Sequence, residues 1–168
     1  MAIDGLADLL RQLDGLRRRA APAMKAALLD AAGLIVKRQQ SLAPVGRGKL
    51  RASIVASDGA APKYASLTAG SRSRKAGDFV VISAGNSGVR YAHLVEFGTK
   101  PHSLAEGAKR KGGKLQDRGP HHPGAKRRPF FFPGYRAERR AAKALIAREM
   151  RRATLDFVKG ASGAYGLP

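Results

Sequence analysis

The segment YAHLVEFGTKPH, residues 91–102, places a histidine and a glutamate within a short apolar stretch of a strongly basic chain. Its apolar spacing predicts a short buried helix, which we expect to end at Gly98 in the left-handed conformation. Pro101 prevents the helix from continuing further. The apolar residues of this predicted helix are Tyr91, Leu94, Val95 and Phe97.

Glu96 is the residue of this segment whose role needs an explanation. A general acid or base would require a second titratable group at working distance, and the sequence supplies no paired carboxylate nearby. A carboxylate among many cations more often forms an ion pair that fixes a turn or a subunit contact. We therefore expect Glu96 to pair with a cation of its own chain or of a neighbouring subunit.

Composition limits the class of protein. The chain has 168 residues, 43% of them apolar, which fits a single domain with long extensions. Lys and Arg outnumber Asp and Glu by 32 to 12, giving a formal charge of +20, so an anionic partner such as nucleic acid is expected, although basic faces also exist without a ligand. The absence of cysteine excludes disulfides, thiolate zinc sites and cysteine nucleophiles.

The expected fold is α+β, with a small antiparallel sheet packed by two long helices. Leucines at helical spacing begin the N-terminal helix, and we expect a break near Pro22, because proline removes an interior hydrogen bond. This leucine stripe consists of Leu6, Leu9, Leu10, Leu13 and Leu16. Short apolar runs predict strands at residues 53–56, 63–70 and 78–85, the last two forming a hairpin with a basic tip.

The C-terminal helix is expected from about Pro133 to Val158, after the aromatic segment RPFFFPGYR at residues 128–136, whose phenylalanines should anchor the core. Its predicted apolar stripe consists of Ala142, Ile146, Met150, Ala153 and Phe157. Within the single domain, 1–168, we divide the chain into an N-terminal helical region 1–41, strands and a short helix 42–98, a basic extended loop 99–128, a C-terminal helix 129–159 and a flexible tail 160–168.

Other site types find little support in the sequence. The loop around Gly46 and Gly48 lacks the spacing of a phosphate-binding loop. The four histidines, His93, His102, His121 and His122, match no zinc site in their spacing. We therefore predict no catalytic residue, no metal and no cofactor. The apolar runs are shorter than a membrane span and no basic leader is present, so we expect no membrane contact and a soluble protein in the cytoplasm where it is made.

Three motifs occur in order: APVGRGKLRASI at residues 43–54, YAHLVEFGTKPH at 91–102 and RPFFFPGYRAERRAAKAL at 128–145. They resemble the patterns A-P-x-x-x-G-x-L-R-x-S-I, Y-A-x-x-V-E-F-G-T and R-P-F-x-x-P-[AG] of the neck and tail-completion (head-tail joining) family of long-tailed bacteriophages. Its members are minor tail components of the lambdoid morphogenesis module. At residue 134 this chain has glycine where alanine is usual in the family.

The resemblance implies a non-enzymatic protein of the virion neck that is present in the host cytoplasm during assembly. It implies a homo-oligomeric ring, such as a hexamer or dodecamer, between the head-closure or connector protein and the tail terminator or tail tube. Such a ring would surround packaged DNA without sequence preference. The fold and assembly motif would then comprise Tyr91, Glu96, Phe97, Gly98, Pro129, Phe130 and Pro133.

The cations with no nearby acid to neutralise them are the candidates for contact with the DNA backbone. These are Lys109, Arg110, Lys111 and Lys114 in the basic loop, and Arg72, Arg74 and Lys75 at the hairpin tip. They could instead dock onto an acidic face of a neighbouring virion protein. A stand-alone, sequence-independent DNA-binding protein would explain the charge equally well, whereas a nuclease would need clustered acids, which the sequence does not contain.

Overall fold

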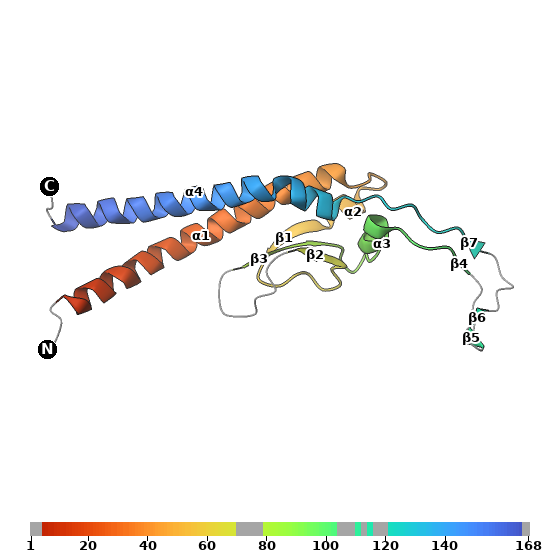
Figure 1. Cartoon of the computed structure of the whole chain (residues 1–168), viewed down its shortest axis with the longest axis horizontal. Coiled ribbons are helices and arrows are strands. Elements are labelled where there is room, and N and C mark those ends of the chain that lie inside the picture. The colour runs from red at the N-terminus through yellow and green to blue at the C-terminus, as the bar shows by residue number, and fades with distance from the viewer. Residues whose placement is uncertain (1–4, 70–78, 104–109, 112–113, 116–120, 166–168) are drawn as a thin grey trace.

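The computed structural model describes residues 5–69, 79–103, 110–111, 114–115 and 121–165. Two long helices, α1 (Leu6–Leu42) and α4 (Phe131–Tyr165), lie side by side, and a small sheet packs against α1 near one end of the pair (Figure 1). The predicted α+β class is therefore confirmed. The first turn of α1 and the last turn of α4 lie at the other end of the pair, beyond the sheet.

The predicted break near Pro22 is wrong, because α1 is continuous from Leu6 to Leu42 with Pro22 inside it. A proline within a helix costs about 3 kcal/mol, since it removes one hydrogen bond and crowds the preceding turn. Pro22 lies on the exposed side of α1, away from the buried Ala27 and Ala31. Packing of α1 along α4 and the sheet therefore outweighs this local cost.

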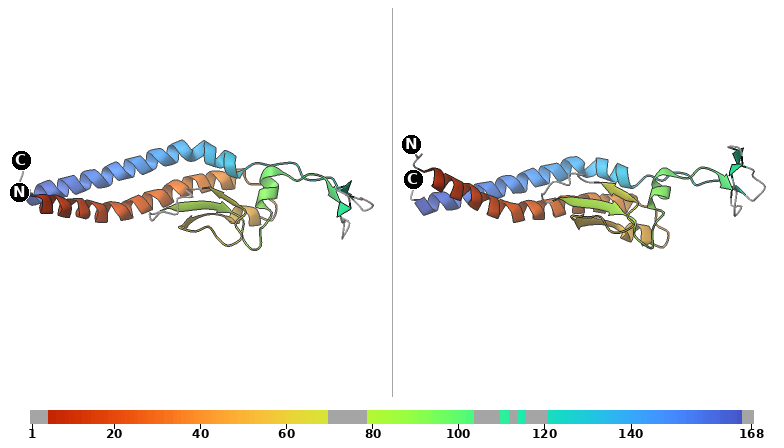
Figure 2. Two further views of the ribbon diagram at one scale, coloured as in Figure 1. Left: turned by 60° about the horizontal axis from the view of Figure 1, so that its bottom comes forward. Right: turned by 90° about the horizontal axis from the view of Figure 1, so that it is seen from below.

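The sheet has three antiparallel strands in the order β1-β3-β2 (Figure 2). They are β1 (Ile54–Asp58), β2 (Leu67–Ala69) and β3 (Val80–Ala84), and a one-turn helix, α2 (Lys49–Ala52), leads into β1. Pairing of β2 with β3 confirms the predicted hairpin. Its basic tip, with Arg72, Arg74 and Lys75, lies outside the described residues.

The basic segment 99–128 was predicted as one extended loop, yet parts of it are paired strands. β4 (His102–Ser103) pairs with β7 (His121–His122), and β5 (Arg110–Lys111) pairs with β6 (Lys114–Leu115). These strands lie at the end of the molecule opposite the free ends of α1 and α4 (Figure 1). We call the paired segments β4–β7 and β5–β6 the ribbon.

The core lies where α1, α4 and the sheet meet. Phe130 and Phe131 are fully buried there, which confirms that the aromatic segment anchors the core. The sheet contributes Ala84, which lies opposite Ile54 on one side and Leu67 on the other, all three buried. The predicted apolar stripe of α4 is buried or half-buried along its length, while the helix continues to Tyr165, so the expected tail at 160–168 begins as helix.

At Gly134 the helices α4 and α1 lie in close contact. A Cβ atom at this position would lie 2.7 Å from Cγ of Gln39 and 3.0 Å from its Cα. Gln39 is fully buried and its Nε2 donates to the carbonyl oxygen of Phe131 over 2.9 Å, so the side chain cannot move away without breaking that bond. Glycine at position 134 thus allows the two helices to touch.

We predict that Gly134→Ala destabilises the protein although alanine favours helix. Overpacking costs about 1–3 kcal/mol, against a gain of about 1 kcal/mol from helix propensity. Gly33→Ala is the matched control, because a Cβ at Gly33 in α1 would meet nothing within 4 Å. Urea unfolding should therefore give a lower unfolding free energy for Gly134→Ala and a higher one for Gly33→Ala. Equal stabilisation by both substitutions would contradict the proposed close contact.

Candidate functional site

Glu96 holds the beginning of α4. Its Oε2 accepts hydrogen bonds from the backbone N–H groups of Phe130 and Phe131 over 2.7 and 2.8 Å, and its Oε1 accepts one from Phe132 over 3.1 Å. The residue is only 3% exposed. One carboxylate therefore receives three consecutive amides that lie 34 to 36 residues further along the chain.

These bonds complete the hydrogen bonding at the helix N-terminus. The first four N–H positions of a helix have no partner within it, and its dipole favours negative charge there. Glu96 satisfies the first three positions, and the fourth is Pro133, which has no N–H. The next residue, Gly134, donates to the carbonyl oxygen of Phe130 over 3.2 Å in the regular helical pattern.

The partner of Glu96 within the chain is therefore a helix end rather than the predicted cation. Among the residues that the structure describes, no Lys, Arg or His nitrogen forms an ion pair with this carboxylate. Backbone amides leave no side-chain signal in the sequence. Only Pro133, three residues after Phe130, indicates where a first helical turn would lie.

The short helix α3 (Ala92–Phe97) turns the expected burial around. It forms as predicted, but its buried residues are Ala92 and Glu96, which lie four positions apart on one face. Tyr91, Leu94 and Phe97, predicted to be buried, are exposed. The ring of Phe97 lies 6.0 Å from that of Phe132, so an aromatic surface covers the junction of α3 with α4.

Gly98 ends α3 and begins the segment that leads into the ribbon. Its φ of 75° is left-handed, and a Cβ atom would lie 2.6 Å from the carbonyl oxygen of Ala125, so only glycine fits without a shift of the backbone. Thr99 and Ala125 then exchange backbone hydrogen bonds of 3.0 and 3.2 Å, and the N–H of Arg128 donates to Val95 over 2.8 Å. Both strands of the ribbon are thus attached to α3 and α4 at their base.

The structure brings together only some of the predicted site residues. Glu96, Phe97, Gly98, Phe130 and Pro133 lie around the start of α4, with Pro129 in the same segment, whereas Tyr91 lies at the other end of α3 as its N-cap. Arg110, Lys111 and Lys114 share the β5–β6 hairpin, in which Lys111 lies opposite Lys114. Lys109 and the three cations of the β2–β3 tip lie outside the described residues.

The histidines form a stacked pair. The rings of His102 and His122 lie 5.0 Å apart across the ribbon. Nδ1 of His102 is 3.0 Å from the carbonyl oxygen of Lys100, and Nδ1 of His122 receives the N–H of Gly124 over 3.0 Å. Within the described segments, no group of three or more His, Cys, Asp or Glu residues is arranged to hold a metal ion.

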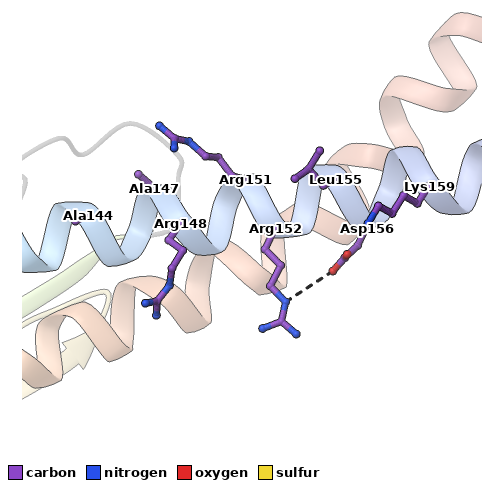
Figure 3. A pocket seen from close by; sticks show the side chains of 8 residues that line it. All are labelled: Ala144, Ala147, Arg148, Arg151, Arg152, Leu155, Asp156 and Lys159. Atoms are coloured by element: carbon purple, nitrogen blue, oxygen red, sulfur yellow. Dashed lines mark ion pairs between the residues drawn. The ribbon is translucent and has the colours of Figure 1, made fainter.

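Two surfaces of the long helices were not recognised from the sequence as sites. Leu6, Leu10 and Leu13 of α1 are exposed, although their spacing resembles that of core residues. On α4, Leu155 lies in a groove between cationic side chains (Figure 3). Apolar residues at helical spacing predict an apolar helix face, but they do not indicate which part of that face another element buries.

The fold is a pair of long helices with a small sheet and a projecting ribbon, and Glu96 joins α3 to the start of α4. In the described part of the chain, no helix is both long and apolar enough to cross a membrane. The sequence matches the family described as "Bacteriophage HK97-gp10, putative tail-component" over residues 7–98. The chain therefore belongs to the HK97-gp10-like family of phage tail components. It is a structural protein of the virion and not an enzyme.

No curated protein sequence and no solved structure matches this chain. The family match ends at Gly98, at the base of the ribbon. It covers Glu96 but neither the ribbon nor α4, which supplies the three amides that Glu96 binds. The roles of these later parts rest on their own geometry.

We predict that Glu96→Ala lowers the unfolding free energy by about 3 kcal/mol, because hydrogen bonds to charged groups contribute about 1.5–3 kcal/mol and buried donors would lose their acceptor. Glu149→Ala is the control, since Glu149 lies on α4 in an exposed pair with Arg148, and such pairs contribute about 0–1 kcal/mol. Urea unfolding measures both variants. A loss at Glu96 no larger than that at Glu149 would contradict the anchoring role.

Proposed function

We propose that this protein is a neck protein that forms a homo-oligomeric ring between the head connector and the tail and surrounds the DNA channel. Membership of a phage tail-component family supports a structural role in the virion. The observation that carries the more specific proposal is the ribbon, which ends in a cationic hairpin far from the helical pair. In this role Tyr91, Phe97 and the aromatic surface around α3 would contact the neighbouring head or tail protein.

The attachment of the ribbon supports a role in reaching toward a partner. Left-handed glycines lie at its base on both strands, Gly98 with φ 75° and Gly124 with φ 85°. A Cβ at Gly124 would lie 2.3 Å from the carbonyl oxygen of Thr99, so the two strands are in close backbone contact there. This contact gives the ribbon a defined direction at its base.

DNA that passes through a ring needs an interaction without base specificity. Contacts of Lys and Arg with phosphates supply affinity that is independent of sequence and falls with salt. The formal charge of +20 and the cations Arg110, Lys111 and Lys114 on one hairpin fit this kind of contact. Arg72, Arg74, Lys75 and Lys109 remain further candidates on sequence grounds.

A stand-alone DNA-binding protein is the second candidate, and the same charge favours it. The two proposals differ in whether the chain has a place at the head-tail joint. The tail-component family favours the neck protein, since a free DNA-binding protein has no reason to belong to a structural family of the virion.

We expect a phage genome that lacks this reading frame to produce filled heads and tails that remain unjoined. Electron microscopy of lysates would count joined and separate particles, and the protein supplied in trans should restore joining. Averaged images of the joint should then gain a ring of density. Normally joined, infectious particles without the protein would refute the neck assignment and leave the DNA-binding alternative.

We also predict that purified protein binds unrelated DNA duplexes with equal affinity, and that this affinity falls steeply with salt. Arg110→Ala, Lys111→Ala and Lys114→Ala together should weaken binding and reduce the slope of log affinity against log salt by about 0.9 for each lost phosphate contact. The control removes the same charge from exposed positions elsewhere: Lys37→Ala, Arg38→Ala and Arg47→Ala. Equal effects of the two triple variants on DNA affinity would contradict the proposed contact between the hairpin and DNA.

A further inference from the structure

Each strand near the base of the ribbon carries a histidine beside a proline. His102 of β4 lies opposite His122 of β7, and the planes of their stacked rings differ by 23°. Each ring also bonds through Nδ1 to the main chain on the far side of its neighbouring proline. His102 bonds to the carbonyl oxygen of Lys100, and His122 bonds to the N–H of Gly124. The two bonds are similar in position but opposite in polarity.

The main-chain partners fix the position of the proton on each ring. A carbonyl oxygen only accepts, so Nδ1 of His102 carries a hydrogen atom. A backbone N–H only donates, so Nδ1 of His122 offers a lone pair to Gly124. A second ring proton on His102 would go to Nε2 and keep the bond to Lys100. A second ring proton on His122 would go to Nδ1 and remove the acceptor that Gly124 uses.

The bond between His122 and Gly124 orients the ribbon where it joins the body. Gly124 is left-handed, and a Cβ atom there would lie 2.3 Å from the carbonyl oxygen of Thr99 on the other strand. The next residue, Ala125, exchanges backbone hydrogen bonds with Thr99. Pro123 has no N–H, so the ring of His122 bonds to the first N–H that follows it. The turn at 122–124 therefore sets the direction in which the ribbon leaves this pair of strands.

Cations surround the two rings along the chain, and no acid occurs in residues 99–103 or 121–128. The other charged or titratable residues of these two segments are Lys100, His121, Lys126, Arg127 and Arg128. Strands β5 and β6 add Arg110, Lys111 and Lys114, and α3 at the base adds His93 and Glu96, whose carboxylate binds the amides of α4. The ribbon projects away from α1, α4 and the sheet (Figure 1 and Figure 2). A positive charge on both stacked rings would therefore be repelled by its surroundings.

We propose that His122 is a pH-sensitive switch that holds the base of the ribbon in one direction when the ring is neutral and releases it when the ring is protonated. Histidine is the side chain that gains a charge between about pH 8 and pH 5. An open base takes up the proton without losing the bond to Gly124. The free energy that favours the closed base is therefore present at the higher pH and falls as the pH falls. The switch acts on the ribbon whether the ribbon contacts DNA or a protein, so it goes beyond the proposed function.

Hydrogen exchange of the Gly124 amide in the full chain measures the switch, after correction for the intrinsic dependence of exchange on pH. We expect the protection of this amide to fall about two- to tenfold between about pH 8 and pH 5, which is the contribution of one hydrogen bond. The amide of Val89 is the internal control. It donates to the carbonyl oxygen of Asn86 in a turn outside the ribbon, so its protection should not change.

Substitutions at the two histidines separate the acceptor from the ring. The side-chain carbonyl of asparagine accepts an N–H two residues further on and does not titrate, so His122→Asn should give the Gly124 amide the same protection at both pH values. His122→Phe keeps a ring for stacking but has no acceptor, so this amide should be poorly protected at both. His102→Phe removes the neighbouring charge and leaves the His122 bond intact, so the loss of protection should begin at a higher pH than in the wild type.

A constant protection of the Gly124 amide in the wild type between these pH values would overturn the proposal. So would a loss of protection with falling pH that persists in His122→Asn, because the proton would then act at another residue. These measurements use the purified chain without DNA or virion proteins. Their outcome is therefore independent of the neck role, which the joining of heads to tails tests.

Discussion

The carboxylate of Glu96 connects the short helix α3 to the start of α4. Glu96 accepts the three amides that begin α4, and it does so from the buried side of a helix of only six residues. A buried charge without partners would be costly, and here the helix end supplies both the hydrogen bonds and the favourable dipole. This contact sets where α4 begins, and the Gln39–Gly134 contact then sets how closely α4 approaches α1.

The ribbon depends on the same contact. The chain leaves the body at Gly98 and returns at Phe130, two points held together by Glu96 and by the bond between Arg128 and Val95. Residues between them can therefore vary in length and charge without moving α4. The family match ends at residue 98, where the chain leaves the body.

Much of the fold followed from periodicity and turn chemistry. Helical spacing predicted the apolar stripe of α4, the β2–β3 hairpin followed from two β-rich runs around a glycine-containing turn, and the phenylalanines at 130 and 131 were expected in the core. The partner of Glu96 was not predictable, because backbone amides 34 residues away leave no trace in composition. The exposure of Leu94 and Phe97 was not predictable either, since helical spacing indicates an apolar face but not whether another element covers that face. Pro22 was misjudged because long-range packing outweighed a local preference.

The order of the elements along the chain has a consequence for biosynthesis. α1 leaves the ribosome first, and α4, which covers it, leaves last. At about 5–20 residues per second, the residues between Leu42 and Phe131 take on the order of ten seconds to make. During that interval the buried residues of α1, such as Ala31 and Ile35, lack the part of their cover that α4 supplies, and Glu96 lacks its amides. Contacts this distant in sequence form slowly, so α1 keeps an exposed apolar face until α4 has been made.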